Sequence, residues 1–212
     1  SDVKYVPEKE LRLANSRTLG LSFVTVYLGM DCSKEELGVE DYTTFITTYA
    51  NPRDCYNHRN EGAYYVVNCH NVAIPDASPE GTCMLFYTIP MREEDFPKDM
   101  KPEEYKKWKN SVAKRFIEDS EKVLGIDITS HIEEIEVATP VTFARYLGTP
   151  AGEIYGYQMA GWDSILPRIM AAPTDFTVKN LSYCGGHAER GDGYSCAYMT
   201  GMLTGDTVVR RL

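Results

Sequence analysis

One long amphipathic helix is the feature that most constrains the fold of this sequence. Residues 103–124 carry an apolar stripe at helical spacing, formed by Tyr105, Trp108, Val112, Phe116 and Val123. Pro102 suits the first turn of such a helix, and Gly125 suits its end. A stripe of this kind could line a ligand cleft, but it is more typical of a helix that lies on a sheet, which is our prediction.

Segments rich in β-branched and aromatic residues lie on both sides of this helix. They predict strands over residues 18–28, 42–49, 63–69, 82–90 and 131–138. The loop at residues 71–81 contains two prolines and Gly81, so we expect no regular element there. Residues 7–13 have the composition of a polar lead-in.

Two short helices are indicated by capping residues. Ser33 is followed three positions later by a glutamate, which predicts a capped helical turn. Thr139 and Pro140 supply an N-cap and a first helical residue for a helix over residues 141–147, which should end near Gly148.

The charge balance excludes one class of partner. The 212 residues include 22 Lys and Arg against 31 Asp and Glu, a formal charge of −9. Proteins that bind nucleic acid as their main partner need clustered basic residues, so nucleic acid is not expected here. No apolar run approaches the roughly 18 residues of a membrane span, and the N-terminus has no secretory signal pattern.

The cysteines and histidines predict neither disulfides nor a metal site. The six cysteines contain no CxxC pair and match no known framework of disulfides, so we expect reduced thiols and a cytoplasmic location. The four histidines are scattered, and the adjacent Cys69 and His70 would point to opposite faces of a strand.

The last part of the chain differs in character from the rest. Residues 149–173 are irregular and rich in glycine and aromatic residues, residues 178–184 predict a short strand, and a helix should begin at Tyr194. A strand, a glycine loop and a helix together present free N–H groups and a positive dipole end to an anion. Residues 191–196 nearly match GxGxxG, but the 16 residues after Cys196 are too few for a dinucleotide crossover. A plain turn and a helix that caps a cofactor both stay open.

Several short motifs follow one another in a characteristic order. They are YLGMD at 27–31, TPVTF at 139–143 with Arg145-Tyr146, GTPAG at 148–152, Tyr155-Gly156, NLSYCGG at 180–186, GDG at 191–193 and Gly201. This series resembles the C-terminal half of the phytoene desaturase, carotenoid isomerase and retinol saturase family of FAD-dependent oxidoreductases. The resemblance covers most of the chain, although no single motif decides it.

The resemblance implies an α+β fold in a protein of two parts. A Rossmann-type domain holds FAD, and an inserted domain holds an apolar substrate beside the flavin, with a mixed, largely antiparallel sheet covered by helices. Residues 1–177 are then expected to form the substrate-binding domain. Residues 178–212 would be the C-terminal strand, glycine loop and helix that return to the FAD domain.

The same resemblance assigns roles to individual residues. Those expected on the flavin side are Gly185, Gly186, Gly191, Asp192, Gly193 and Tyr194. Reduced flavin gathers negative charge near N1 and O2, which a helix N-terminus stabilises. Arg145, Tyr155 and Tyr157 are weaker candidates for lining the cavity beside the flavin, with a purely structural role as the alternative. No acid–base triad is predicted.

Two departures from the family pattern matter. Gly186 stands where many members have an acidic or hydroxyl residue, and the N-terminal GxGxxG with its acidic partner is missing. We therefore expect a C-terminal piece of a larger enzyme that transfers a hydride between FAD and a hydrophobic, unsaturated substrate. Alone it should bind FAD poorly and be inactive, because the N-terminal FAD-binding domain is its missing partner. The alternative is a non-catalytic module that binds a lipid or another hydrophobic ligand, and peripheral contact with a membrane is left open.

Overall fold

The structure is a computed structural model that describes residues 3–57, 64–158, 178, 181–186 and 193–212. The chain divides into two compact units, one formed by residues 22–152 and the other by residues 1–21 together with 153–212. The first unit is therefore continuous in sequence and is inserted between two segments of the second. This boundary after residue 152 differs from the one predicted after residue 177, and the roles assigned to the two parts stay predictions.

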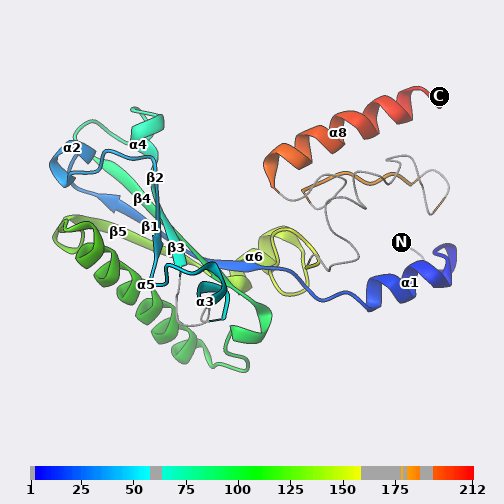
Figure 1. The fold of residues 1–212 in the computed structure, drawn as a ribbon, viewed down its shortest axis with the longest axis horizontal. Helices are drawn as coiled ribbons and strands as arrows, with labels where there is room; N and C mark the ends of the chain where they lie inside the picture. The colour runs from blue at the N-terminus through cyan, green and yellow to red at the C-terminus, as the bar shows by residue number, and fades with distance from the viewer. Residues whose placement is uncertain (1–2, 58–63, 159–177, 179–180, 187–192) are drawn as a thin grey trace. The chain divides into compact units, whose positions relative to one another are not determined.

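A five-stranded sheet forms the centre of the 22–152 unit (Figure 1). Its strands are β1 (Ser22–Met30), β2 (Thr43–Thr47), β3 (Tyr64–Cys69), β4 (Cys83–Met91) and β5 (Ile132–Ala138). They lie in the order β2-β3-β4-β1-β5, and every neighbouring pair is antiparallel. The predicted α+β class with a largely antiparallel sheet is confirmed.

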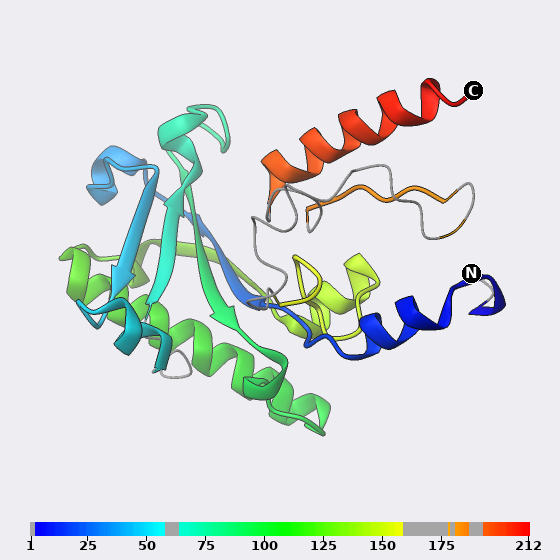
Figure 2. The same cartoon turned by 45° about the vertical axis from the view of Figure 1, so that its right-hand side comes forward.

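The long helix α5 (Pro102–Leu124) packs along one face of this sheet (Figures 1 and 2). Its buried side chains include Ala113, Phe116 and Ile117. The Phe116 ring meets the Tyr65 ring edge-on with centroids 4.9 Å apart. Hydroxyl hydrogen bonds of 2.7 Å join the sheet to the helix at Tyr65 with Asp119 and at Tyr87 with Ser120. The predicted helix and its position on a sheet are confirmed.

The core lies between this helix and the sheet because alternate side chains of each strand point the same way. The inward residues of β1 are Val24, Val26, Leu28 and Met30, each at most 1% exposed. We call this the inner face of the sheet and the opposite side the outer face.

The predicted helix caps are present. Ser33 forms a capping box with Glu36 at the start of α2 (Lys34–Leu37), and Thr139 forms one with Thr142 at α6 (Pro140–Leu147). Gly125 and Gly148 end α5 and α6 in the left-handed conformation that glycine adopts at little cost. The short helices α3 (Pro52–Asn57), α4 (His70–Ala73), η3 (Glu93–Asp95) and η4 (Thr129–His131) complete this unit.

Some sequence-based predictions were wrong in detail. The polar lead-in contains the helix α1 (Glu8–Asn15), after a 3-10 turn η1 (Val3–Tyr5). The helix α4 (His70–Ala73) occupies the start of a loop that was expected to be irregular. Residues 181–184, the described end of the predicted strand over 178–184, belong to no strand. The closing helix is confirmed as α8 (Tyr194–Val209).

The predicted first strand begins four residues late because residues 18–21 pair elsewhere. In the second unit they run antiparallel to the segment from residue 154, through hydrogen bonds from Gly20 N to Gly156 O (2.7 Å) and from Ile154 N to Leu21 O (3.0 Å). In the 22–152 unit the Ser22 hydroxyl donates to the Gly152 carbonyl over 2.6 Å. The first and last residues of the 22–152 unit are therefore joined by a hydrogen bond. Among the helices of the described residues, none has the length and apolarity to cross a membrane.

Candidate functional site

The outer face of the sheet carries apolar and aromatic side chains that α5 does not cover. The strand register places Phe45, Val66 and Thr88 in one row across β2, β3 and β4. A second row contains Asn68, Phe86 and Tyr27. Phe45 is 78% exposed and Tyr27 42% exposed, which is unusual for aromatic residues at the centre of strands. This face therefore exposes aromatic side chains among uncharged polar ones.

Four rings form a continuous series on this face. Tyr27 stacks on Phe86 with centroids 6.4 Å apart, Phe86 contacts His70 at 4.7 Å, and His70 meets Tyr42 edge-on at 6.2 Å. Flat rings in offset or edge-on contact present a surface suited to another flat, unsaturated molecule. Met84, 37% exposed, adds a polarizable side chain beside them.

The polar side chains at the centre of the outer face carry no charge. The Asn68 amide donates to the Thr43 hydroxyl over 2.6 Å, so it is already satisfied. The carboxylates of Glu134 and Glu136 lie only on the edge strand β5. At the opposite edge an open pocket of about 360 Å³ is lined by Thr47, Tyr49, Ala50, Pro52, Cys55 and Tyr64. A neutral apolar strip with a pocket at one edge can position a hydrophobic molecule but offers it no acid or base.

The predicted flavin-side residues are only partly described. Gly191 and Asp192 lie outside the described residues. Gly193 is the N-cap of α8 with φ +97°, and Tyr194, its first residue, is 85% exposed. Gly193 has no side chain with which to cap the first turn of α8. The start of this helix is thus formed by backbone and an exposed ring, without a side-chain cap.

Gly185 and Gly186 are held beside α8 by a buried hydroxyl. The Gly185 N–H donates to the Thr200 hydroxyl over 3.1 Å, and the Thr200 hydroxyl reaches the Cys196 carbonyl over 2.8 Å. A Cβ on Gly186 would lie 3.4 Å from the Gly193 carbonyl oxygen. The structure therefore brings Gly185, Gly186 and Gly193 together, although they are up to eight positions apart.

The three weaker candidates are not brought together by any described contact. Arg145 is exposed in the last turn of α6, in the 22–152 unit. Tyr155 and Tyr157 belong to the other unit and are half-buried. Tyr157 forms a β-bridge with Leu19, and the Arg17 guanidinium lies 5.7 Å from its ring centre. The contacts of Tyr157 are those of a packing residue.

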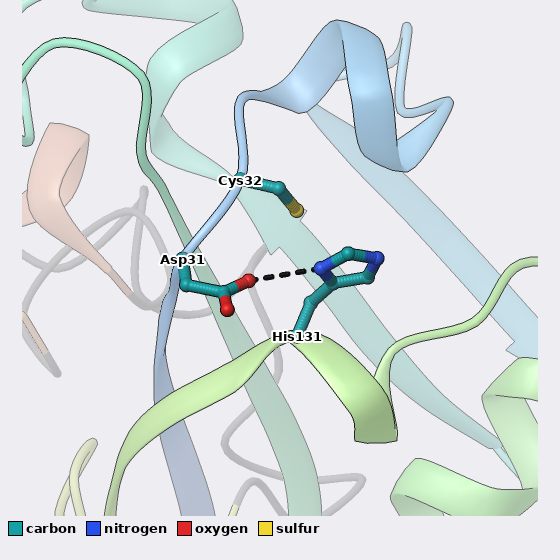
Figure 3. Close-up of side chains that lie close together, drawn as sticks. All are labelled: Asp31, Cys32 and His131. Carbon is teal, nitrogen blue, oxygen red and sulfur yellow. Dashed lines mark hydrogen bonds and ion pairs between the residues drawn. The ribbon is translucent and has the colours of Figure 1, made fainter.

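A group of side chains that sequence reasoning missed lies at the end of β1. Asp31, Cys32 and His131 place a carboxylate oxygen, a sulfur and a ring nitrogen all within 4.8 Å of one another (Figure 3). His131 Nδ1 and Asp31 Oδ1 are 2.8 Å apart. The signal in the sequence was the position of these residues, since Asp31 lies three residues after the predicted strand over 18–28 and His131 begins the predicted strand over 131–138. Antiparallel pairing of β1 with β5 brings the two ends together.

Comparison with known proteins adds no family to these observations. No protein-family model matches the chain, and no curated protein matches it.

Proposed function

We propose that the chain supplies the substrate-binding and flavin-capping parts of an FAD-dependent oxidoreductase of the phytoene desaturase type. The outer face of the sheet, with its exposed rings, is the observation that carries this proposal. Burial of apolar surface contributes roughly 25 cal/mol per Å², so a face of this composition favours a hydrophobic ligand. The stacked series from Tyr27 to Tyr42 favours an unsaturated one.

The arrangement of the chain supports the same proposal. The 22–152 unit is inserted between two segments of the other unit, as a substrate domain is inserted into the FAD domain in the family that the sequence resembles. The helix α8 belongs to the flanking unit and begins at a glycine with positive φ. Its N-terminus would stabilise negative charge on a bound flavin without a titrating base.

In this proposal the residues of the chain position the substrate beside the flavin. Bound FAD accepts or delivers the hydride. The residues of the outer face need only exclude water and hold the reacting carbon of the substrate at a fixed place. Holding two reactants in the right geometry can by itself supply a large part of the rate enhancement of an enzyme. The uncharged centre of that face fits this role, because the Asn68 amide already donates to the Thr43 hydroxyl and no charged group has to be desolvated there.

A fluorescent conjugated polyene, cis-parinaric acid, tests the substrate side of the proposal. We expect the chain to bind it, and Phe45→Ser to weaken binding about tenfold, because one buried aromatic side chain is worth about 1.5 kcal/mol or more. Tyr146→Ser is the matched control, since Tyr146 lies on α6 and is 80% exposed against 78% for Phe45. Absence of binding, or an equal loss in both variants, would contradict the assignment of the outer face.

A further inference from the structure

The group of Asp31, Cys32 and His131 is built by three features of the fold. Asp31 and Cys32 follow the last residue of β1, and the Asp31 N–H donates to the His131 carbonyl over 3.0 Å. The register between β1 and β5 shifts after Gly29, so that Met30 pairs with Ile132 and Glu133 is the extra residue of a bulge. Bulges re-aim side chains and are common beside functional sites. Here the bulge immediately precedes the point where His131 meets Asp31.

The three donor atoms match one class of cation. A carboxylate oxygen, a thiolate sulfur and an imidazole nitrogen are ligands of zinc, whereas Mg²⁺ and Ca²⁺ select oxygen. Zinc bonds of about 2.0 to 2.3 Å place the ligands of a tetrahedron about 3.3 to 3.8 Å apart. The donors here are 2.8 to at most 4.8 Å apart. Small rotations of the Asp31 and His131 side chains, which are 56% and 40% exposed, can reach the tetrahedral spacing.

The charge around the group favours a cation. Hydrogen bonds from Ser33 lower the pKa of Glu36, and the His131 ring lowers it further. Hydrogen bonds from Ser130 lower the pKa of Asp127, again with a contribution from His131. Asp31, Glu36 and Asp127 are thus three carboxylates that lie near one imidazole.

Cys32 belongs to the hydrophobic core behind the group. Cys32 is 5% exposed, and the core cysteines Cys69 and Cys83 are each 1% exposed. Cys32 thus lies on the core side of the group, and Asp31 and His131 lie on its solvent-exposed side.

We propose that Asp31, Cys32 and His131 bind a zinc ion, with the fourth position open to water. The site has three protein ligands, as hydrolytic and other catalytic zinc sites have, rather than the four of structural sites. It lies within the 22–152 unit and does not depend on the proposed binding of flavin or of a polyene.

The test is a metal titration of the metal-free, tag-free chain. Co²⁺ should give the near-ultraviolet charge-transfer absorption of a cobalt–thiolate bond at one equivalent, and Zn²⁺ should remove it. In competition with a chromogenic chelator, Cys32→Ser and His131→Gln should each weaken Zn²⁺ binding by more than about 100-fold, the upper end of the range for outer-shell changes.

Two controls keep the result specific. Cys55→Ser and His70→Ala change a half-buried thiol and a half-buried imidazole elsewhere in the same unit, and both should leave the affinity unchanged. His131→Gln alters an exposed side chain, so its fold is retained even where the Cys32 variant is unstable. No thiolate band with Co²⁺, or a band that survives His131→Gln, would overturn the proposal.

Discussion

Gly152→Ala tests how closely the end of the 22–152 unit packs against the start of α6. Gly152 has φ +76°, and its carbonyl accepts the hydrogen bond from Ser22. A Cβ at this position would lie 2.1 Å from the Pro140 carbonyl oxygen and 2.9 Å from the Pro140 Cα. Both atoms are backbone at the start of α6, so no side chain can rotate away to make room.

The expected loss of stability has two parts. The left-handed conformation costs a non-glycine residue about 1 to 2 kcal/mol. Overpacking against rigid neighbours adds about 1 to 3 kcal/mol. Together they predict that Gly152→Ala lowers the free energy of unfolding of the 22–152 unit by about 2 to 5 kcal/mol.

Gly148→Ala separates the two parts. Gly148 has φ +69°, and a Cβ there would have nothing within 4 Å, so this variant should lose only the conformational part. Urea unfolding is followed by the fluorescence of Trp108, which packs edge-on against Phe96 in this unit, after Trp162→Phe removes the other tryptophan. If Gly152→Ala costs no more than Gly148→Ala, the close approach of Gly152 to Pro140 is refuted.

Two further predictions concern pH and the segment beside α8. Burial raises the pKa of Tyr87 from its ordinary value of 10.0 to about 12, so its stabilisation is present below pH 10 and is lost as pH rises toward 12. In urea unfolding, Tyr87 should account for up to about 2 to 3 kcal/mol of the loss over that range, and Tyr87→Phe should reduce the loss by that amount. The remaining loss belongs to Tyr65, whose pKa burial also raises, and an unchanged slope in Tyr87→Phe would contradict the burial of the Tyr87 hydroxyl. Thr200→Val removes the acceptor of the Gly185 N–H, so the Gly185 amide should exchange faster with solvent. Thr207→Val, which breaks only a bond to Leu203 within α8, should leave that rate unchanged, and equal rates in both variants would count against the role of Thr200.

Local signals in the sequence predicted most of the elements correctly. Thr139, Pro140 and Gly148 define α6 through capping and backbone conformation alone, and the apolar stripe of α5 needs only helical spacing. Such signals depend on residues a few positions apart, so they can be read without knowing the fold. The helix α1 was missed because it is short and mostly polar, and none of its residues is buried.

Features that depend on distant residues could not be predicted in this way. Asp31 and His131 are 100 positions apart, and they meet because β5 pairs with β1 and carries a bulge. The outer face required the order of strands, since Phe45 and Phe86 share a face only through the register of β2, β3 and β4. The late start of β1 has the same origin, because residues 18–21 pair with a segment more than 130 positions away.

The most direct test of the central proposal is the absorption spectrum of the protein expressed from the complete open reading frame with FAD. The account predicts bound flavin whose absorption bands shift when a conjugated polyene is added, with a weaker response in Phe45→Ser and an unchanged one in Tyr146→Ser. A protein that binds the polyene but remains colourless and takes up no flavin would contradict the oxidoreductase proposal and favour a non-catalytic module for hydrophobic ligands.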